Sequence, residues 1–370
     1  MFEGYENRWY FREQMEGIEV VRVKTFIAPN EGTLKRILDF TSYMATGFTA
    51  GLFQSRPDVV VASSPQIFTA VGGWALGNVR GVPHVLELAD LWPASIVDVG
   101  ALSEGPVLSF LQRMELFLYR KSHSVVALTR AFKRDLTARG IEPEKIAVVI
   151  NGVETSSYSP RPRHQQLEAE HGLDGCFVIG YLGTFGMAHA LMNVLDAAEI
   201  LAKEAPHIRY LLVGAGAERE KLVRAQRERG LKNVLILPQV SKDVVADYWS
   251  LCDVGLVHLK NRPTFATVIP SKIWESIGMG LPVLLASPKG EASEIIEGEG
   301  FGVWVPAEDP RALADASSRL AADEASYQTL KQQAIKSAPL HSREKQARDM
   351  LTVLERVART ESEPVPTELK

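Results

Sequence analysis

The sequence predicts an α/β fold of two tandem Rossmann-like, doubly wound domains, and three observations lead to this prediction. Short apolar runs alternate with helical patterns along almost the whole chain, which is typical of parallel βαβ units. The chain has 370 residues, more than one ordinary hydrophobic core accommodates. A charged stretch with prolines and serines, residues 154–174, separates two such alternating series.

The first domain is expected to span residues 1–155. Its strands are predicted from short apolar runs at Ile18–Val23, Val59–Ala62, His84–Leu88, Ser124–Ala127 and Ile146–Ile150. Its helices are predicted at Gly32–Gln54, Pro65–Asn78, Gly105–Lys121 and Arg130–Arg139. The stretches 34–48 and 108–121 are amphipathic, which fits a helix packed on the core as well as one resting on a membrane surface.

A linker is expected at 156–174 and a second domain at 175–338. The expected strands are Phe177–Leu182, Ile208–Val213, Val234–Leu237, Val254–Val257, Val283–Leu285 and Gly302–Val305. Helices are expected between them, at Leu191–Ala202, Glu218–Arg229 and Lys242–Ser250. Past Pro310 the chain reads as helical to about Arg359, with a break near Pro339, and the polar end at 361–370 is expected to be frayed.

Composition excludes several classes of protein. Hydrophobic residues make up 46% and charged residues 23%, as in ordinary globular proteins, and the net charge of −4 argues against a nucleic-acid partner. Cys176 and Cys252 lie in apolar surroundings without metal-ligand spacing, which indicates buried thiols in a reducing compartment. No apolar run approaches the roughly 20 residues that span a bilayer, and the N-terminus does not read as a signal peptide, so a cytoplasmic location is expected.

The segment from Pro270 to Glu275 carries the most informative charges. Pro270 ends the preceding segment, and Ser271 is expected to cap a helix with its hydroxyl. Lys272 is unusual there, because a cation in the first turn opposes the helix dipole unless an anion binds. The helix amides and Lys272 would suit a diphosphate, and Glu275 would suit ribose hydroxyls. An ordinary solvated helix end remains an alternative.

Two glycine-containing turns follow expected strands in the second domain. Gly183-Thr184-Phe185-Gly186 would let the backbone approach a phosphate closely, although a dinucleotide fingerprint is absent. Gly214 begins a similar turn that borders the same region. For both turns, a purely structural need for glycine is the alternative.

Further charged residues are expected at the carboxyl ends of strands. Lys260 and Arg262 are candidate phosphate ligands, with a solvated loop as the alternative. Glu291 is expected at a helix N-terminus at the carboxyl end of a strand, as a candidate ligand contact, with simple complementation of the helix dipole as the alternative. Asp90 follows a first-domain strand and is the candidate catalytic residue, for acceptor binding or proton handling, with a turn role as the alternative.

Taken together, these motifs resemble retaining GT-B glycosyltransferases of family 4, in the fucosamine-transferase-like branch that builds O-antigen and exopolysaccharide repeats. The resemblance covers residues 1–360. In the first domain it rests on Ser64-Pro65, Asp90-Leu91-Trp92-Pro93 and Ile150-Asn151-Gly152-Val153. In the second it rests on the Gly183 and Gly214 turns, Pro270-Ser271-Lys272, Glu275, Gly280-Leu281-Pro282-Val283 and Gly290-Glu291.

The resemblance implies metal-independent transfer of a sugar from a nucleotide diphosphate sugar, without a cofactor and with retention at the anomeric carbon. The donor would bind the second domain and the acceptor the first, and residues 340–360 would cross back to the first domain. Two departures stand out in the donor site. Thr267 occupies the position of a first glutamate, and Met187–Asn193 has no Arg or Lys, so Lys272 would be the main phosphate cation.

A third departure concerns the start of the chain. The family opens with an apolar strand, a Gly-rich loop and a helix before the segment that matches Tyr5 onward. The first domain is therefore expected to be incomplete, through a truncated start or through degeneracy.

The leading hypothesis is a glycosyltransferase that uses a nucleotide-sugar, with a UDP-sugar favoured, and a lipid-linked or saccharide acceptor in cell-surface polysaccharide biosynthesis. Peripheral contact with the inner face of the cytoplasmic membrane accompanies it. One alternative is a sugar-nucleotide epimerase, although Asp90 has few acid–base partners in its domain. The other is a truncated, non-catalytic partner subunit, motivated by the incomplete first domain.

Overall fold

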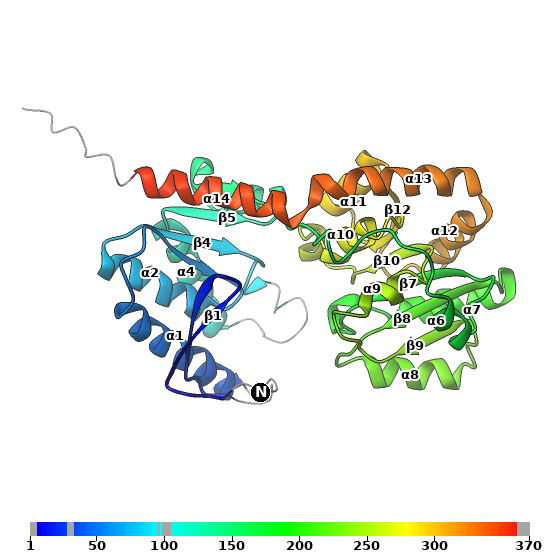
Figure 1. Ribbon diagram of the computed structural model, residues 1–370, viewed down its shortest axis with the longest axis horizontal. Coiled ribbons are helices and arrows are strands. Elements are labelled where there is room, and N and C mark those ends of the chain that lie inside the picture. Colours follow the sequence, from blue (N-terminus) through cyan, green and yellow to red (C-terminus); the bar gives the residue numbers. More distant parts are fainter. Residues whose placement is uncertain (1–5, 28–32, 95–96, 98–104, 361–370) are drawn as a thin grey trace, which may run out of the picture. The chain divides into compact units, whose positions relative to one another are not determined.

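The computed structural model describes residues 6–27, 33–94, 97 and 105–360, and its elements are shown in Figure 1. The chain divides into two compact units. Unit 1 comprises Met1–Val149 with Asp349–Lys370, and unit 2 comprises Ile150–Arg348. The segment 361–370, which was expected to be frayed, lies outside the described residues.

Unit 1 is built on a four-stranded parallel sheet in the order β3-β4-β5-β6. The strands are β3 (Val60–Ser63), β4 (His84–Leu88), β5 (Ser124–Ala127) and β6 (Ile146–Val148). The helices that belong to this unit are α1 (Thr33–Leu52), α2 (Ile67–Arg80), α4 (Pro106–Lys121) and α5 (Arg130–Ala138), with a 3₁₀ turn η1 at Pro143–Lys145. No helix among the described residues is long and apolar enough to cross a membrane.

The last helix, α14 (Arg343–Thr360), begins in unit 2 and ends in unit 1. Val353 and Val357 of α14 pack in one cluster with three valines of unit 1. These are Val85 of β4, Val126 of β5 and Val149, the residue after β6. In Figure 1 this part of α14 runs along β5. The C-terminal helix therefore completes the core of unit 1.

The start of the described chain differs from the expected βαβ pattern. The strand predicted at Ile18–Val23, β2, pairs antiparallel with an unpredicted strand, β1 (Tyr10–Met15), in a separate two-stranded hairpin. Both residues of the connecting turn have positive φ, 51° at Glu16 and 84° at Gly17, the conformation that matches the twist of a tight hairpin. This turn, rather than a crossover helix, determines the pairing of β2.

Unit 2 contains a six-stranded parallel sheet in the order β12-β11-β10-β7-β8-β9. The strands are β7 (Phe177–Leu182), β8 (Ile208–Val213), β9 (Val234–Leu237), β10 (Val254–His258), β11 (Val283–Ser287) and β12 (Gly302–Pro306). The order reverses between β7 and β10. In a doubly wound sheet, this reversal opens a crevice at the carboxyl ends of the two strands, where ligands bind.

The helices of unit 2 cover both faces of this sheet. They are α6 (Gln165–Glu170), α7 (Met192–Glu204), α8 (Arg219–Glu228), α9 (Val245–Trp249), α10 (Ser271–Gly278), α11 (Glu291–Glu299), α12 (Pro310–Ala322) and α13 (Glu324–Ser337). The 3₁₀ turns are η2 (Met187–His189), η3 (Pro263–Ala266) and η4 (Ala338–His341). Tyr181 and Leu182 are both buried but belong to different core clusters, because successive residues of β7 point to opposite faces.

The segment predicted as a linker is packed within unit 2 instead. It contains α6, and Leu173 is 1% exposed in the core cluster around Trp249. Arg163 forms salt bridges with Glu168 and Asp253. Because Asp253 directly precedes β10, these salt bridges attach the segment to the sheet of unit 2. The stretch is polar overall, and only a few apolar side chains, such as Leu173, attach it to the core of unit 2.

Candidate functional site

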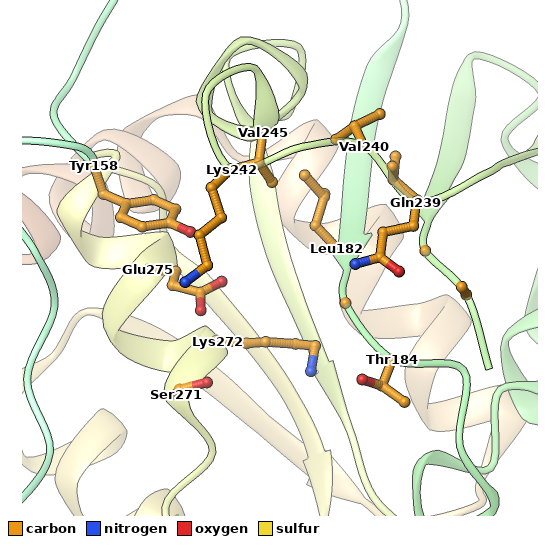
Figure 2. Close-up of a pocket in the computed structure, with 14 residues that line it drawn as sticks. Tyr158, Leu182, Thr184, Gln239, Val240, Lys242, Val245, Ser271, Lys272 and Glu275 are labelled. Carbon is orange, nitrogen blue, oxygen red and sulfur yellow. The ribbon is translucent and has the colours of Figure 1, made fainter. Parts of the chain in front are cut away.

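A cavity of about 330 Å³ lies at the carboxyl ends of β7 and β8 in unit 2 (Figure 2). It is lined by Tyr158, Leu182, Gly183, Thr184, Val213, Gly214, Ala215, Gln239, Val240, Lys242, Val245, Ser271, Lys272 and Glu275. The strand ends provide the floor, α10 provides Lys272 and Glu275, and the loop after β9 provides Lys242. The cavity thus occupies the region where a doubly wound sheet binds its ligands.

Helix α10 positions the two central charges. Ile273 and Ile277, one turn apart, are 1% and 0% exposed, so one face of the helix is anchored in the core. The expected cap at Ser271 is wrong, because Pro270 is the N-cap with extended backbone and Ser271 is the first helical residue. Proline has no side-chain hydrogen-bond acceptor, so Pro270 provides no side-chain cap for the first amides of α10.

Lys272 lies over Gly183 at the floor of the cavity. Its Nζ is 4.9 Å from the centroid of the Tyr181 ring, and a Cβ on Gly183 would come within 2.8 Å of Nζ. Burial lowers the pKa of Lys272, and the nearby carboxylate of Glu275 opposes this shift. Among the described residues Lys272 forms no salt bridge, so it is a largely buried cation that an anionic ligand would neutralise.

Glu275 lies one turn further along α10. Burial raises the pKa of its carboxyl group, while Lys272, Arg343 and the Ser271 hydroxyl act in the opposite direction. Tyr158 lines the same cavity, and burial together with the charge of Glu275 raises the pKa of its phenol to about 12. The phenol is therefore neutral near pH 7 and can donate a hydrogen bond beside the carboxylate.

The two glycine turns pack against each other. Gly183 has a φ of 145°, and a Cβ on Gly214 would overlap the carbonyl oxygen of Gly183. Gly216 is equally restricted, since a Cβ there would lie 2.5 Å from the carbonyl oxygen of Phe185. Close backbone packing therefore explains Gly214 and Gly216 without a ligand, whereas the Gly183 turn also lines the cavity beneath Lys272.

The structure brings together some of the sequence-predicted donor residues and separates others. Gly183, Thr184, Gly214, Ser271, Lys272 and Glu275 all line the cavity. Gly186 and Glu291 are not among the described lining residues. Glu291 is 3% exposed and has a partner, and its neighbour Gly290 is pressed against the carbonyl of Ala266, so this turn is part of the packed interior.

The two candidate phosphate cations lie in a loop beside the cavity. The Lys260 amide donates to the Ala188 carbonyl at 2.8 Å, and the Asn261 amide donates to Glu308 at 2.7 Å. Neither Lys260 nor Arg262 lines the cavity among the described residues. One backbone hydrogen bond thus attaches this loop to η2, which follows the first glycine turn.

Sequence reasoning missed Tyr158, Gln239 and Lys242. Tyr158 lies in the segment 156–174, for which the sequence predicts a linker. Lys242 was assigned to a helix, but α9 begins only at Val245, which leaves Gln239 and Lys242 in a loop that points to the cavity (Figure 2). Their position after β9 was the available signal, because side chains that follow parallel strands gather at one edge of the sheet.

Asp90 belongs to unit 1 and follows β4. It is half-buried and borders a small cavity of about 20 Å³ with Ser64 and Trp92. Beside it, Ser63 donates a hydrogen bond to Glu87. No cluster of three or more potential metal-ligating side chains occurs in the part of the chain that the structure describes.

Comparisons with known proteins agree with this architecture. Residues 3–152 match the family model described as glycosyl transferase 4-like domain, and residues 176–323 match the one described as glycosyl transferases group 1. The putative colanic acid biosynthesis glycosyl transferase WcaI of Escherichia coli K12 is 25% identical over 321 residues, which cover 84% of this chain and 78% of the relative.

Solved structures show the same fold at low sequence identity. Anabaena Alr3699/HepE in complex with UDP and glucose has a TM-score of 0.68 and 20% identity, covering 91% of this chain and 84% of that chain. Sucrose-phosphate synthase from Thermosynechococcus elongatus has a TM-score of 0.77 and 17% identity, covering 97% and 87%. The predicted fold of two Rossmann-like domains is confirmed.

Proposed function

The chain belongs to the group 1 glycosyltransferases of family 4, and we propose that it transfers a sugar from a nucleotide diphosphate sugar to a lipid-linked or saccharide acceptor. A UDP-sugar is the favoured donor, and the setting is cell-surface polysaccharide biosynthesis at the inner face of the cytoplasmic membrane. The relative WcaI is described as a putative colanic acid biosynthesis glycosyl transferase, and HepE was solved in complex with UDP and glucose. The observation that carries the proposal is the largely buried Lys272 without a salt-bridge partner among the described residues, at the start of α10.

Each part of the nucleotide has a matching group in the cavity. The diphosphate would bind Lys272, the first turn of α10 and the turn at Gly183 and Thr184, which line the cavity together. The carboxylate of Glu275 would accept hydrogen bonds from the ribose hydroxyls. Lys242 and Gln239, from the loop after β9, would border the nucleoside.

In the proposed reaction, the bond between the anomeric carbon and the diphosphate oxygen breaks, and the diphosphate keeps the electron pair. The acceptor hydroxyl oxygen forms the new glycosidic bond, and its proton passes to a phosphate oxygen of the leaving group. Lys272 and the amides of α10 would stabilise the charge that develops on the diphosphate. Asp90 of unit 1 would bind the acceptor, and retention at the anomeric carbon is the family's outcome.

Contact with a membrane surface fits an exposed face of α4 in unit 1. Val107, Phe110 and Phe117 are 56%, 61% and 40% exposed on this helix. Its exposed charges are Arg113, Arg120 and Lys121, which are all basic. Its only acid, Glu115, is 4% exposed and forms a salt bridge with Arg139. Apolar side chains flanked by cations suit an anionic lipid surface that carries a lipid-linked acceptor.

Titration calorimetry with UDP and GDP tests the donor assignment. Binding of one nucleotide, followed by release of that nucleotide from its sugar conjugate when a membrane extract supplies acceptor, is the expected result. If neither nucleotide binds the purified protein, the proposed donor site is rejected.

A further inference from the structure

His189 ends the short turn η2 that follows Gly186, and its imidazole lies near the donor cavity without lining it. The ring packs edge-on against Tyr181, with 5.8 Å between the ring centroids. The same Tyr181 ring lies 4.9 Å from Lys272 Nζ. A Cβ on Gly186 would lie 3.6 Å from His189 Cδ2. The imidazole therefore lies just beyond the first glycine turn, beside the cation that the proposed diphosphate would contact.

Hydrogen bonding determines which ring nitrogen of His189 carries the proton. Nδ1 lies 3.4 Å from the carbonyl oxygen of His258, and a carbonyl can only accept, so the proton is on Nδ1. Burial, with a smaller contribution from the charge of Lys272, lowers the pKa of His189 to about 4, so the ring is neutral near pH 7. Nε2 consequently presents a lone pair and acts as a hydrogen-bond acceptor.

Nε2 of His189 remains available to a ligand. Within the described residues it has no hydrogen-bond partner, and it is not among the fully buried polar atoms without one. Since the residue as a whole is half-buried, this nitrogen is its accessible polar atom. An acceptor that is presented by a mostly buried ring is preorganised, because the surrounding packing has already restricted its rotation.

The support behind His189 is rigid. His258, which accepts through its carbonyl, is the last residue of β10 and is fully buried. Its Nε2 lies 2.8 Å from the side-chain nitrogen of Asn193. The Lys260 amide also donates to the carbonyl of Ala188, the residue before His189. The turn is thus attached to the end of the central strand β10 at two points.

The charged groups of the site have a linear order. On α10, Lys272 precedes Glu275 by one turn. Tyr158 lies beside Gly278 and Glu275 of α10 (Figure 2), whereas His189 packs on the same Tyr181 ring as Lys272. Tyr158 therefore marks the Glu275 end of the site, and His189 marks the Lys272 end. A nucleotide sugar has its own order of ribose, diphosphate and hexose.

Resting on the proposed function, we propose that His189 is a binding residue for the transferred sugar, whose hydroxyl group donates a hydrogen bond to Nε2. With ribose at Glu275 and diphosphate at Lys272, the hexose is the next group along the molecule and reaches the imidazole. A phosphate oxygen is a poor partner for the neutral ring, because it carries lone pairs and negative charge but no proton to donate. The ligand is therefore a sugar that bears a hydroxyl at the position facing Nε2.

The test compares nucleotides with nucleotide sugars in the wild type and in His189→Ala and His189→Gln. The probes are UDP, GDP, UDP-glucose, UDP-galactose, UDP-N-acetylglucosamine and GDP-mannose, measured by titration calorimetry. We expect His189→Ala to bind the free nucleotide as the wild type does and to lose about tenfold in affinity for the nucleotide sugar, the scale of one hydrogen bond to a polar ligand group. His189→Gln should restore part of the loss, because its amide oxygen can accept.

Met187→Ala provides a matched control, since Met187 lies in the same turn and is 49% exposed. It should change neither affinity. The inference is overturned if His189→Ala weakens nucleotide and nucleotide sugar equally, which would assign the ring to the diphosphate or to packing. It is also overturned if the variant changes nothing, or if no probe sugar alters wild-type affinity. A wild type that binds neither UDP nor GDP would instead reject the proposed function itself.

Discussion

The side chain of Lys272 occupies the space where a side chain of Gly183 would lie, so the cation packs directly on the glycine turn. A Cβ on Gly183 would lie within 2.8 Å of Lys272 Nζ and even closer to Cε. The glycine is required for two reasons, because its φ of 145° is also a conformation that side chains rarely adopt. The position of the cation therefore depends on the absence of a side chain in the first turn of the sheet.

Gly183→Ala should displace Lys272 and weaken nucleotide binding about tenfold or more, with a loss of about 1–2 kcal/mol in the free energy of unfolding from the strained backbone. Gly230→Ala is the matched control, because Gly230 has a φ of 62° and nothing within 4 Å of a Cβ. Calorimetry with UDP and urea unfolding separate the two effects. Equal affinities in both variants would show that Lys272 does not depend on Gly183.

Glu275→Ala should weaken nucleotide binding by about 1–3 kcal/mol, the scale of a lost charged hydrogen bond. Glu275 lies on the opposite face of α10 from the buried Ile273 and Ile277, so the variant keeps the core contacts of the helix. Comparing UDP with 2′,3′-dideoxy-UDP by calorimetry isolates the ribose contribution. Wild type and variant should bind the dideoxy nucleotide alike, and a variant with unchanged affinity for UDP would refute the ribose assignment.

Lys272→Met should weaken nucleotide binding about 10- to 100-fold and, in the absence of ligand, raise the free energy of unfolding. The pKa of Lys272 is lowered because the cost of burying its charge outweighs the attraction of Glu275. A methionine of similar length removes that cost and keeps the packing. Urea denaturation with and without UDP measures both quantities. A less stable variant would show that Lys272 has a structural role in the empty site.

Some of this structure could be predicted because the relevant signals are local. Ile208–Val213 is a continuous apolar run, as expected of a parallel strand that is buried on both faces, and its predicted bounds agree with β8. An unfavourable charge in one helical turn predicts a site at Lys272 and Glu275, and both residues line the cavity. Both signals lie within a few residues of sequence.

The errors arise where tertiary packing overrides the local signal. The sequence of β1, Tyr10–Met15, mixes three polar residues with three aromatic or apolar ones and lacks the alternation of a strand, yet the turn at Glu16 and Gly17 pairs it with β2. Tyr158 reads as part of a polar linker, but it lies against Gly278 of α10 and lines the cavity. No pattern around Tyr158 indicates the distant residues that it contacts.

Acid should destabilise both units through buried neutral histidines. His84 in unit 1 and His258 in unit 2 are 1% and 0% exposed, and burial lowers the pKa of each to about 4 from 6.5. Between these values the unfolded state binds protons that the folded state does not, so this stability is complete above pH 6.5 and is lost as the pH falls toward 4. The loss is on the order of 2–3 kcal/mol for each histidine.

Urea unfolding at several pH values between 7.5 and 4.5 measures this dependence. His84→Gln should reduce the pH dependence of the free energy of unfolding for unit 1 and leave the pH dependence for unit 2 unchanged. His207→Gln replaces an exposed histidine and should have no effect. A steep acid dependence that persists for unit 1 in His84→Gln would assign the effect to other groups.

Phe110→Ser should weaken binding to anionic vesicles, because this side chain is 61% exposed on the basic face of α4. Transfer of a phenylalanine side chain from water into the lipid interface contributes about 1.5–3 kcal/mol, so the vesicle partition coefficient should fall about tenfold or more. Co-sedimentation with phosphatidylglycerol vesicles measures it, and neutral phosphatidylcholine vesicles or high salt should abolish most of the binding by removing the attraction for Arg113 and Arg120. Leu340→Ser, at a 62% exposed position in unit 2, should bind as the wild type does. Equal losses in both variants, or equal binding to neutral vesicles, would mean that α4 is not the membrane contact.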